Sequence, residues 1–532
     1  MRAACLLLAA PVSLAWTANS VIGARHCDSC HHALSLSSTI GVSNCQHVGK
    51  QVQTGSVLCQ HQQPSRSRKV LLRSVAPGGG GAAAANSSPQ ADRIPVGVVA
   101  VLSAAFLNLL GFTMAGPITP ELGTHFNLDV GPSFGALTSA YPLGMLFGLF
   151  LWPQISDRAG RKPIMAFSLL GSAIGLSMQA YSILAGWSLP AFLAMRVLTG
   201  CFAGSSPVSK AYLADLGSSI GRLPKYLALR DAASTLAFIL GPTLGGLFFE
   251  GRRKMAAATT AAASSDATGS LAFVIGTSAL ASLAASALIA FFVKEDKSFV
   301  VSSRKKAEGI EENHVADQKQ GEDEIVSCPL GVGLWAGVAT VCLVSFLFNV
   351  GDSTFFAFFP ALLRSSIGLD TRSIGLAFTS FACISFAVST TLTGESIRRF
   401  GPVATCVAGL SAIGTGLIAL AGASAMSSVL PALVFIAAAL YYSGVPLYGP
   451  TVPTMLLQCV PPHRRGAVMG LDGAVNTLAR VISPLVMGAL YRSRGPSAAF
   501  GVAGGAALSA AVLATTRRML VIKKRQGFNG SK

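Results

Sequence analysis

The feature that most constrains this chain is the repeated occurrence of apolar segments about 20 residues long. A helix needs roughly 20 apolar residues to cross a hydrocarbon core about 30 Å thick. Within lipid a helix also satisfies its own backbone hydrogen bonds, which an irregular segment does not. Twelve segments fit this description: Val96–Pro117, Ser133–Trp152, Pro163–Ala185, Ala191–Leu213, Tyr226–Phe249, Leu271–Val293, Leu334–Phe359, Ser373–Gly394, Pro402–Ala421, Val429–Leu456, Ala467–Tyr491 and Ala498–Thr515. The sequence therefore predicts an all-α membrane protein with twelve transmembrane helices.

Composition and the placement of charge support the same fold class. The chain is 51% apolar and only 12% charged, a balance that is not typical of a soluble chain of this length. The net charge of +18 would suit nucleic acid if it formed one patch. The loops after the second, fourth, eighth and tenth segments and the C-terminal tail instead carry more Lys and Arg than the loops on the opposite side. By the positive-inside rule we expect both ends of the membrane region on the cytoplasmic side or its equivalent, and no nucleic-acid partner.

Residues 1–91 have the composition of a targeting segment rather than of a membrane domain. They contain seven Lys or Arg and one acid, Asp28, with many Ser, Ala and Gly. An apolar run at Leu6–Leu14 before Trp16 resembles a signal peptide, and the basic, Ser-rich stretch that follows resembles a transit peptide. Together they resemble the bipartite plastid leaders of algae with complex plastids. A mitochondrial leader and a disordered tail are the other hypotheses, so the location ranges from a plastid envelope or other organelle membrane to the plasma membrane.

The same leader holds five of the eleven cysteines. The segment Cys27–His31 has the Cys-x-x-Cys-His spacing used for covalent haem attachment. The match is only five residues long, and the surrounding sequence predicts no folded pocket. We therefore expect neither a cofactor nor a metal, and we interpret the other six cysteines as small packing residues in apolar helices.

The membrane region is predicted to consist of two related halves. At an offset near 240 residues Gly111 matches Gly351, and at 242 residues Pro242 matches Pro484. Two parallel six-helix repeats imply a central cavity that opens to either face as one half rocks against the other; a bundle without a pathway is the alternative. A segment with nine of the 22 acids separates the halves and indicates a solvated linker. The predicted parts are the halves 96–293 and 331–516, the linker 294–330 and a basic tail 517–532.

The loop after the second predicted helix carries a recognisable charged pattern. It resembles the loop of the major facilitator superfamily, in which Asp-Arg-x-Gly-Arg-Arg/Lys follows a Gly; here Pro153 replaces that Gly. The resemblance implies that this loop forms a gate between the two halves, and an anchor that obeys the positive-inside rule is the alternative. A basic loop before the eleventh helix resembles the tetracycline-resistance exporters. The expected gate residues are Asp157, Arg158, Gly160, Arg161, Lys162, Arg464 and Arg465.

The fourth and fifth helices extend this resemblance to the drug:proton antiporters. Arg196 precedes Gly200 in the fourth helix, and the family assigns such an Arg to proton coupling or gating. An intramembrane cation usually faces a cavity or a partner. Asp215 closes the fourth helix in a way similar to the tetracycline-type antiporters. The fifth helix contains small residues and a proline, namely Gly241, Pro242, Gly245 and Gly246. They predict either a bend or a close packing face, and both interpretations stay open.

One departure from the family bears on energetics. The family carries an acid in the first helix where this chain has Asn108, and an amide does not titrate. If protons drive transport, we expect Asp352 in the seventh helix to carry them. The alternative is that the predicted span is wrongly placed and Asp352 is a solvated residue. Asp231 and Asp472 are expected to be gate or capping residues, and Arg480 to pair with an acid across the bundle.

These features predict a secondary transporter of small organic molecules, proton-coupled and working by antiport or efflux through alternating access. Phe346, Phe348, Phe355 and Tyr442 are expected among its substrate contacts. An uncoupled metabolite facilitator and a transporter-like receptor or scaffold are the alternatives. No catalytic motif supports an enzyme, and we expect a monomer in the lipid bilayer.

Overall fold

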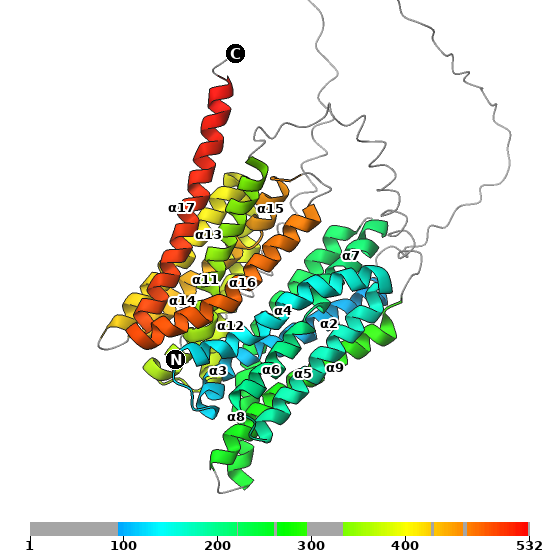
Figure 1. Cartoon of the computed structure of the whole chain (residues 1–532), viewed down its shortest axis with the longest axis vertical. Helices are drawn as coiled ribbons and strands as arrows, with labels where there is room; N and C mark the ends of the chain where they lie inside the picture. Colours follow the sequence, from blue (N-terminus) through cyan, green and yellow to red (C-terminus); the bar gives the residue numbers. More distant parts are fainter. Residues whose placement is uncertain are drawn as a thin grey trace, which may run out of the picture. The chain divides into compact units, whose positions relative to one another are not determined.

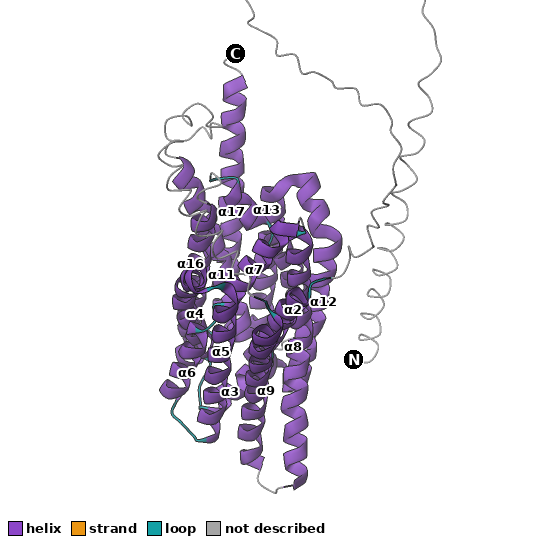
Figure 2. Cartoon of the chain, turned by 90° about the vertical axis from the view of Figure 1, so that its right-hand side faces the viewer, coloured by secondary structure: helices purple, strands orange, loops and turns teal. Residues whose placement is uncertain are grey.

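The computed structural model describes residues 94–220, 222–259, 263–294, 333–426, 430–460 and 465–529, all within the compact unit that begins at Ile94. The expected leader 1–91, with Cys27–His31, and nearly all of the expected linker lie outside the described residues. Every regular element in the described part of the chain is a helix (Figure 2).

The first half contains six membrane spans, two of which are each built from a pair of shorter helices. The first span joins α2 and α3, and the fourth joins α6 and α7 across a turn at residues 202–204. Figure 1 shows these elements grouped together from blue to green. Their bounds are α2 Val96–Thr113, α3 Ala115–His125, α4 Pro132–Ala159, α5 Arg161–Leu184, α6 Leu189–Cys201, α7 Ser205–Ile220, α8 Leu223–Thr259 and α9 Ala263–Phe292.

The second half also contains six membrane spans. The described residues contain 11 stretches long and apolar enough to cross a membrane, and the longest, Thr371–Ala425, has 55 residues. Gly401 interrupts it with φ 82° and ψ 167°, so it comprises two spans and the total is twelve. The bounds are α11 Gly333–Ile367, α12 Thr371–Val388, π-helical η1 Ser389–Thr393, α13 Gly394–Ala425, α14 Pro431–Tyr448, α15 Thr451–Leu457, α16 Arg465–Arg494 and α17 Pro496–Asn529.

Backbone geometry at two loops supports the internal repeat. Gly160, between α4 and α5, and Gly401, within α13, both have positive φ, at 101° and 82°. Asn127 and Gly368 also have positive φ, at 51° and 74°, and occupy matching positions in the two halves. Each pair is 241 residues apart, which lies between the offsets of 240 and 242 residues at which the two halves match in sequence. Left-handed backbone is strained for most residues, so its recurrence at matching turns indicates that the two halves share one local chain path.

The halves pack on each other through two equivalent helix pairs. The starts of α4 and α12 lie against α16 and α8 of the opposite half. A Cβ on Gly135 would overlap the carbonyl of Pro484, and a Cβ on Gly375 would overlap the carbonyl of Pro242. Small residues thus allow backbone-to-backbone approach across the interface. Asp157 lies about 33 Å farther along α4 than Gly135, so these contacts form on the side opposite the Asp157 loop.

Several helices are longer than the apolar segments that predict them. Helix α8 extends to Thr259, and α17 continues to Asn529 through most of the expected tail. The first span runs through α3 to His125 instead of ending at Pro117. Hydropathy marks the part of a helix that lipid covers, whereas backbone hydrogen bonding continues beyond it.

Candidate functional site

The charged loop between α4 and α5 is organised around Arg161. Its Nη1 lies 2.5 Å from Oδ1 of Asp157 and donates to the Ser156 hydroxyl at 2.9 Å, and its Nε lies 3.4 Å from Oδ2 of Asp215. Gly160 provides the left-handed turn that brings α5 back beside α4. The loop and the end of the fourth span are thereby joined within the first half.

The remaining charged gate candidates flank this cluster in the chain or lie beyond the described side chains. Arg158 is exposed and Lys162 is partly buried. Arg464 lies outside the described residues, and Arg465 begins α16 with its side chain undescribed. A gate contact between the Asp157 loop and this basic segment therefore stays a prediction.

The counterpart loop of the second half has its own ion pairs. Arg398 and Arg399 both pair with Glu395, one helical turn away. Glu395 thus supplies both arginines with a local negative partner from the same segment. All three side chains are on the segment that precedes Gly401.

The Gly and Pro residues of the fifth span lie in the packing face of α8. Cβ atoms on Gly241 and Gly245 would overlap Thr113 and Met114 of the first span, and one on Gly246 would approach the backbone of Thr371 in the other half. Helix α8 continues through Pro242. Close packing is therefore what these residues provide in this conformation, while a role for the proline in bending stays a prediction.

A buried acid links the two halves on the side opposite the Asp157 loop. Glu121 of α3 is 7% exposed and accepts hydrogen bonds from Arg364 and, at 2.8 Å, from the Thr371 hydroxyl. Nearby, the hydroxyls of Thr243 and Thr379 are 2.5 Å apart across the same interface. The sequence did not single out Glu121, because the predicted first span ended at Pro117.

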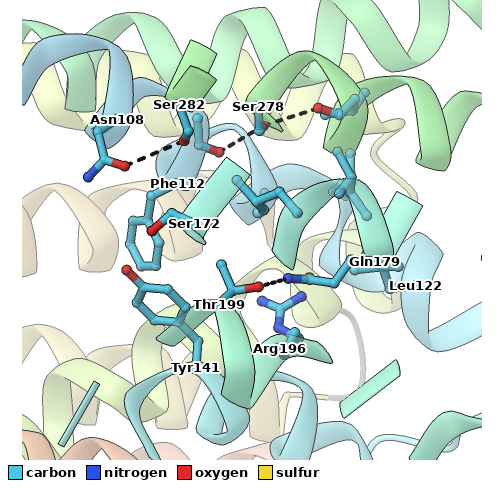
Figure 3. A pocket seen from close by; sticks show the side chains of 16 residues that line it. Asn108, Phe112, Leu122, Tyr141, Ser172, Gln179, Arg196, Thr199, Ser278 and Ser282 are labelled. Atoms are coloured by element: carbon cyan, nitrogen blue, oxygen red, sulfur yellow. Dashed lines mark hydrogen bonds between the residues drawn. The ribbon is translucent and has the colours of Figure 1, made fainter. Parts of the chain in front are cut away.

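A pocket within the first half contains Arg196 (Figure 3). Its walls come from α2, α3, α4, α5, α6 and α9, and they combine Phe112, Ile118 and Leu122 with polar groups. Gln179 donates to the Thr199 hydroxyl at 2.6 Å beside Arg196. The Arg196 Nε is buried without a hydrogen-bond partner, although insertion of an Arg at the bilayer centre costs at least about 2.5 kcal/mol.

A second pocket adjoins the first at Asn108, which lines both. The Asn108 Oδ1 accepts a hydrogen bond from Ser282 at 3.5 Å, so the amide that replaces the family's acid faces pocket-lining polar groups. Lys210, Arg230 and Asp231 line the second pocket. Arg230 donates to the Ser206 hydroxyl at 2.7 Å and lies 3.8 Å from Asp231.

The second half contains a continuous chain of polar contacts around Asp352. Tyr441 donates to its Oδ1 at 2.7 Å, and Arg480 lies 3.8 Å from its Oδ2. Arg480 also donates to Asn349 at 2.9 Å. Asp352 is 8% exposed and therefore buried inside α11, in contrast to the alternative of a solvated residue in a misplaced span. Because Arg480 is on α16, the pair joins two helices of this half.

Asp472 belongs to the same chain of contacts. Asn349 donates to Asn476 at 3.0 Å, and Asn476 donates to Asp472 at 2.9 Å. The other carboxylate oxygen of Asp472 is buried beside Ser345. Asp472 lies two turns inside α16, whereas a capping residue precedes the first turn, so the geometry differs from the expected capping role. Asp231 is also inside its helix, the third turn of α8.

Three of the four aromatic residues expected to contact substrate are buried in the core of the second half, and Phe346 is half-buried. Phe355 is fully buried and stacked on Tyr441 at 4.1 Å between centroids, and Phe348 is stacked on Tyr448 at 3.8 Å. Tyr442 is 8% exposed and packs against Phe355. These contacts stabilise the helix packing around Asp352, and they identify Tyr441, rather than Tyr442, as the hydroxyl that bonds the carboxylate.

The family model of the Major Facilitator Superfamily matches residues 101–318 and 341–531. This chain belongs to the Major Facilitator Superfamily. Its helical membrane fold is that of a transporter superfamily, as the sequence predicted.

Curated relatives in this superfamily include bacterial resistance proteins. Tetracycline resistance protein, class C, of Escherichia coli is 24% identical over 405 residues, which are 74% of this chain and 89% of that protein. Major facilitator superfamily domain-containing protein 10 of Mus musculus is 31% identical over 176 residues, which cover 28% of this chain and 38% of that protein.

Solved structures share the fold at low sequence identity. A D-xylose-proton symporter has a TM-score of 0.62 at 18% identity and covers 78% of this chain and 96% of its own. The human organic anion transporter MFSD10 has a TM-score of 0.52 at 21% identity and covers 79% of this chain and 99% of its own.

Proposed function

We propose that this superfamily member is a proton-coupled antiporter that exports small organic molecules by alternating access. The observation that carries the proposal is the buried carboxylate of Asp352, held between the Tyr441 hydroxyl and the Arg480 guanidinium. A buried carboxylate that exchanges a proton changes its net charge beside Arg480, and that change alters the contact between α11 and α16.

Two further observations support this function. Most of the chain aligns with tetracycline resistance proteins, whose names indicate resistance to a small organic drug. The halves meet through paired helix contacts on one side, while the Asp157 loop and Asp215 form their ion pairs within the first half. This arrangement suits a transporter whose halves separate and close in turn.

The test is transport in proteoliposomes of the full-length chain, with tetracycline as the first substrate because of its relatives. We expect uptake driven by an imposed pH gradient to collapse when an ionophore dissipates the gradient. Asp352→Asn is expected to abolish gradient-driven transport and to retain exchange of substrate for substrate. Asp129→Asn, an exposed acid in the loop before α4, is the matched control.

An uncoupled facilitator is the second candidate, because Asn108 lies in the pocket where the family carries an acid. If the unmodified chain exchanges substrate at the same rate with and without a pH gradient, that result would favour the uncoupled facilitator. If gradient-driven transport instead survives in the Asp352→Asn variant, the protein is still proton-coupled, but Asp352 is not the proton carrier.

A further inference from the structure

The chain of polar contacts in the second half contains two buried carboxylates. Asp352 and Asp472 are each 8% exposed, and contacts through Asn349 and Asn476 connect them. Among the described side chains of this chain of contacts, Arg480 is the one cation, and it lies 3.8 Å from Asp352. Asp472 precedes Arg480 on α16 by about 12 Å along the helix axis. The single cation therefore serves Asp352 and is distant from Asp472.

Neutral groups surround Asp472 instead. Its Oδ2 accepts a hydrogen bond from the Asn476 amide at 2.9 Å. Its Oδ1 lies beside the hydroxyl of Ser345, a residue of α11 that is 0% exposed, and Tyr448 contacts the same hydroxyl. No Lys or Arg whose side chain the structure describes forms an ion pair with Asp472. The carboxylate thus has hydrogen-bonding partners and no countercharge.

The other ionisable groups around Asp472 do not supply a charge either. They are the Cys342 thiol of α11 and the Tyr448 phenol of α14, which are groups that are ordinarily uncharged at neutral pH. The charged residues of α4 are in its last turn, where Asp157 pairs with Arg161. Helix α15 and residues 496–516 of α17 contain no ionisable side chain. Asp472 is therefore a buried acid in neutral surroundings.

A proton resolves this imbalance better than a metal ion. A buried charge without a partner costs several kcal/mol, and an acid in this position avoids that cost by becoming neutral. Once protonated, Asp472 can donate its O–H to Ser345 while its other oxygen still accepts from Asn476. A metal ion would need further oxygen ligands, but the Asn476 oxygen already accepts a hydrogen bond from Asn349.

We propose that Asp472 is a second proton-binding residue, which holds a proton from bulk water in this conformation while Asp352 stays ionised against Arg480. Within the proposed antiport, on which this part of the inference rests, the second half then has two proton sites instead of one. Asp472 lies about 18 Å from Pro484 along α16, away from the contacts between the halves. It is therefore the proton site nearer the side of the Asp157 loop.

The test is infrared difference spectroscopy of the purified full-length chain in lipid bilayers at neutral pH, in water and in heavy water. A protonated carboxyl group gives a carbonyl band that is separate from the amide bands, whereas an ionised carboxylate does not. We expect Asp472→Asn to lose a component of this band. Asp352→Asn is expected to retain it, and so is Asp129→Asn, the exposed acid in the loop before α4.

Two further variants test the surroundings of Asp472. Ser345→Ala removes the hydroxyl beside Oδ1 and is expected to move the same component to a higher frequency, because the carboxyl loses a hydrogen bond. This shift decides the question if Asp472→Asn does not give monodisperse protein. Arg480→Gln is expected to increase the band, because Asp352 then lacks its cation and takes up a proton. An unchanged band in Arg480→Gln would contradict the division of charge between the two acids.

Transport then tests whether the second proton is exchanged. In proteoliposomes Asp472→Asn is expected to halve the number of protons exchanged per substrate molecule, measured from the pH gradient that just balances an opposing substrate gradient. If that number is unchanged although the infrared component is lost, the proton at Asp472 is fixed and the two-site cycle is rejected.

The outcomes separate this inference from the proposed function. Identical carboxyl bands in the unmodified chain and in Asp472→Asn would overturn the inference. A component assigned to Asp472 in a chain that shows no proton-driven transport would support the site and contradict the proposed function. Proton-driven transport by a chain without that component would do the reverse.

Discussion

At the scale of single residues, the environment of Asp352 combines one neutral donor with one cation. The Tyr441 hydroxyl is at hydrogen-bond distance, whereas Arg480 lies at 3.8 Å and its side chain is 45% exposed. The exposed guanidinium is partly screened by its surroundings, so its attraction for the carboxylate is weaker than that of a fully buried partner. Arg480 can therefore be drawn away without a large loss of stability.

This balance predicts a measurable coupling between the two charges. Arg480→Gln leaves a buried carboxylate without a cation and is expected to lower the thermal stability of the purified protein. Adding Asp352→Asn removes that carboxylate and is expected to restore about 1 kcal/mol. Arg494→Gln, an exposed arginine at the end of the same helix, serves as the control. Strictly additive losses in the double variant would contradict the pairing.

The sequence identified the charged members of this site but could not supply its neutral ones. Asp352 and Arg480 stand out because ionisable residues are rare in apolar helices. Tyr441, Asn349 and Asn476 carry no such signal, since a helix that is apolar on all sides does not reveal which face an aromatic or amide side chain occupies. Their contribution became visible only from the contacts in the structure.

At the scale of helices, hydropathy and the internal repeat predicted the spans and their grouping into halves. The breaks between α2 and α3 and between α6 and α7 were not predictable, because residues on both sides of each break are compatible with a helix. Glu121 was missed for a related reason. An acid in a long apolar helix is a strong signal, but the predicted span ended before it and placed it in a loop.

The paired contacts between halves lead to a prediction for two glycines. Gly135→Ala and Gly375→Ala each place a Cβ onto a carbonyl of the facing helix, a clash that the backbone relieves only by separating the helices. Overpacking of this kind costs about 1–3 kcal/mol, so we expect a transport rate about tenfold lower. Gly276→Ala, whose Cβ meets nothing within 4 Å, is the control. Wild-type rates in both interface variants would show that this closed contact is not required.

At the scale of the whole membrane unit, the charged contacts divide between two sides. The ion pair of Glu121 with Arg364 crosses between the halves, whereas the ion pairs of Arg161 stay within one half. Loss of the crossing pair upon separation leaves a buried carboxylate unpaired, which is costly unless water enters. Opening of this side is therefore coupled to hydration of Glu121, and closure to its dehydration against Arg364 and Thr371.

Alternating access requires this interface to separate in each cycle, and a crosslink can test that requirement. The hydroxyls of Thr243 and Thr379 lie 2.5 Å apart across the halves, a separation compatible with a disulfide after replacement of both residues. In a chain whose native cysteines are replaced by alanine, oxidation of the Thr243→Cys/Thr379→Cys variant is expected to stop transport, and reduction to restore it. Each single variant should be insensitive to the oxidant. Full transport by quantitatively crosslinked protein would show that the halves need not part here, and alternating access through this interface would then be rejected.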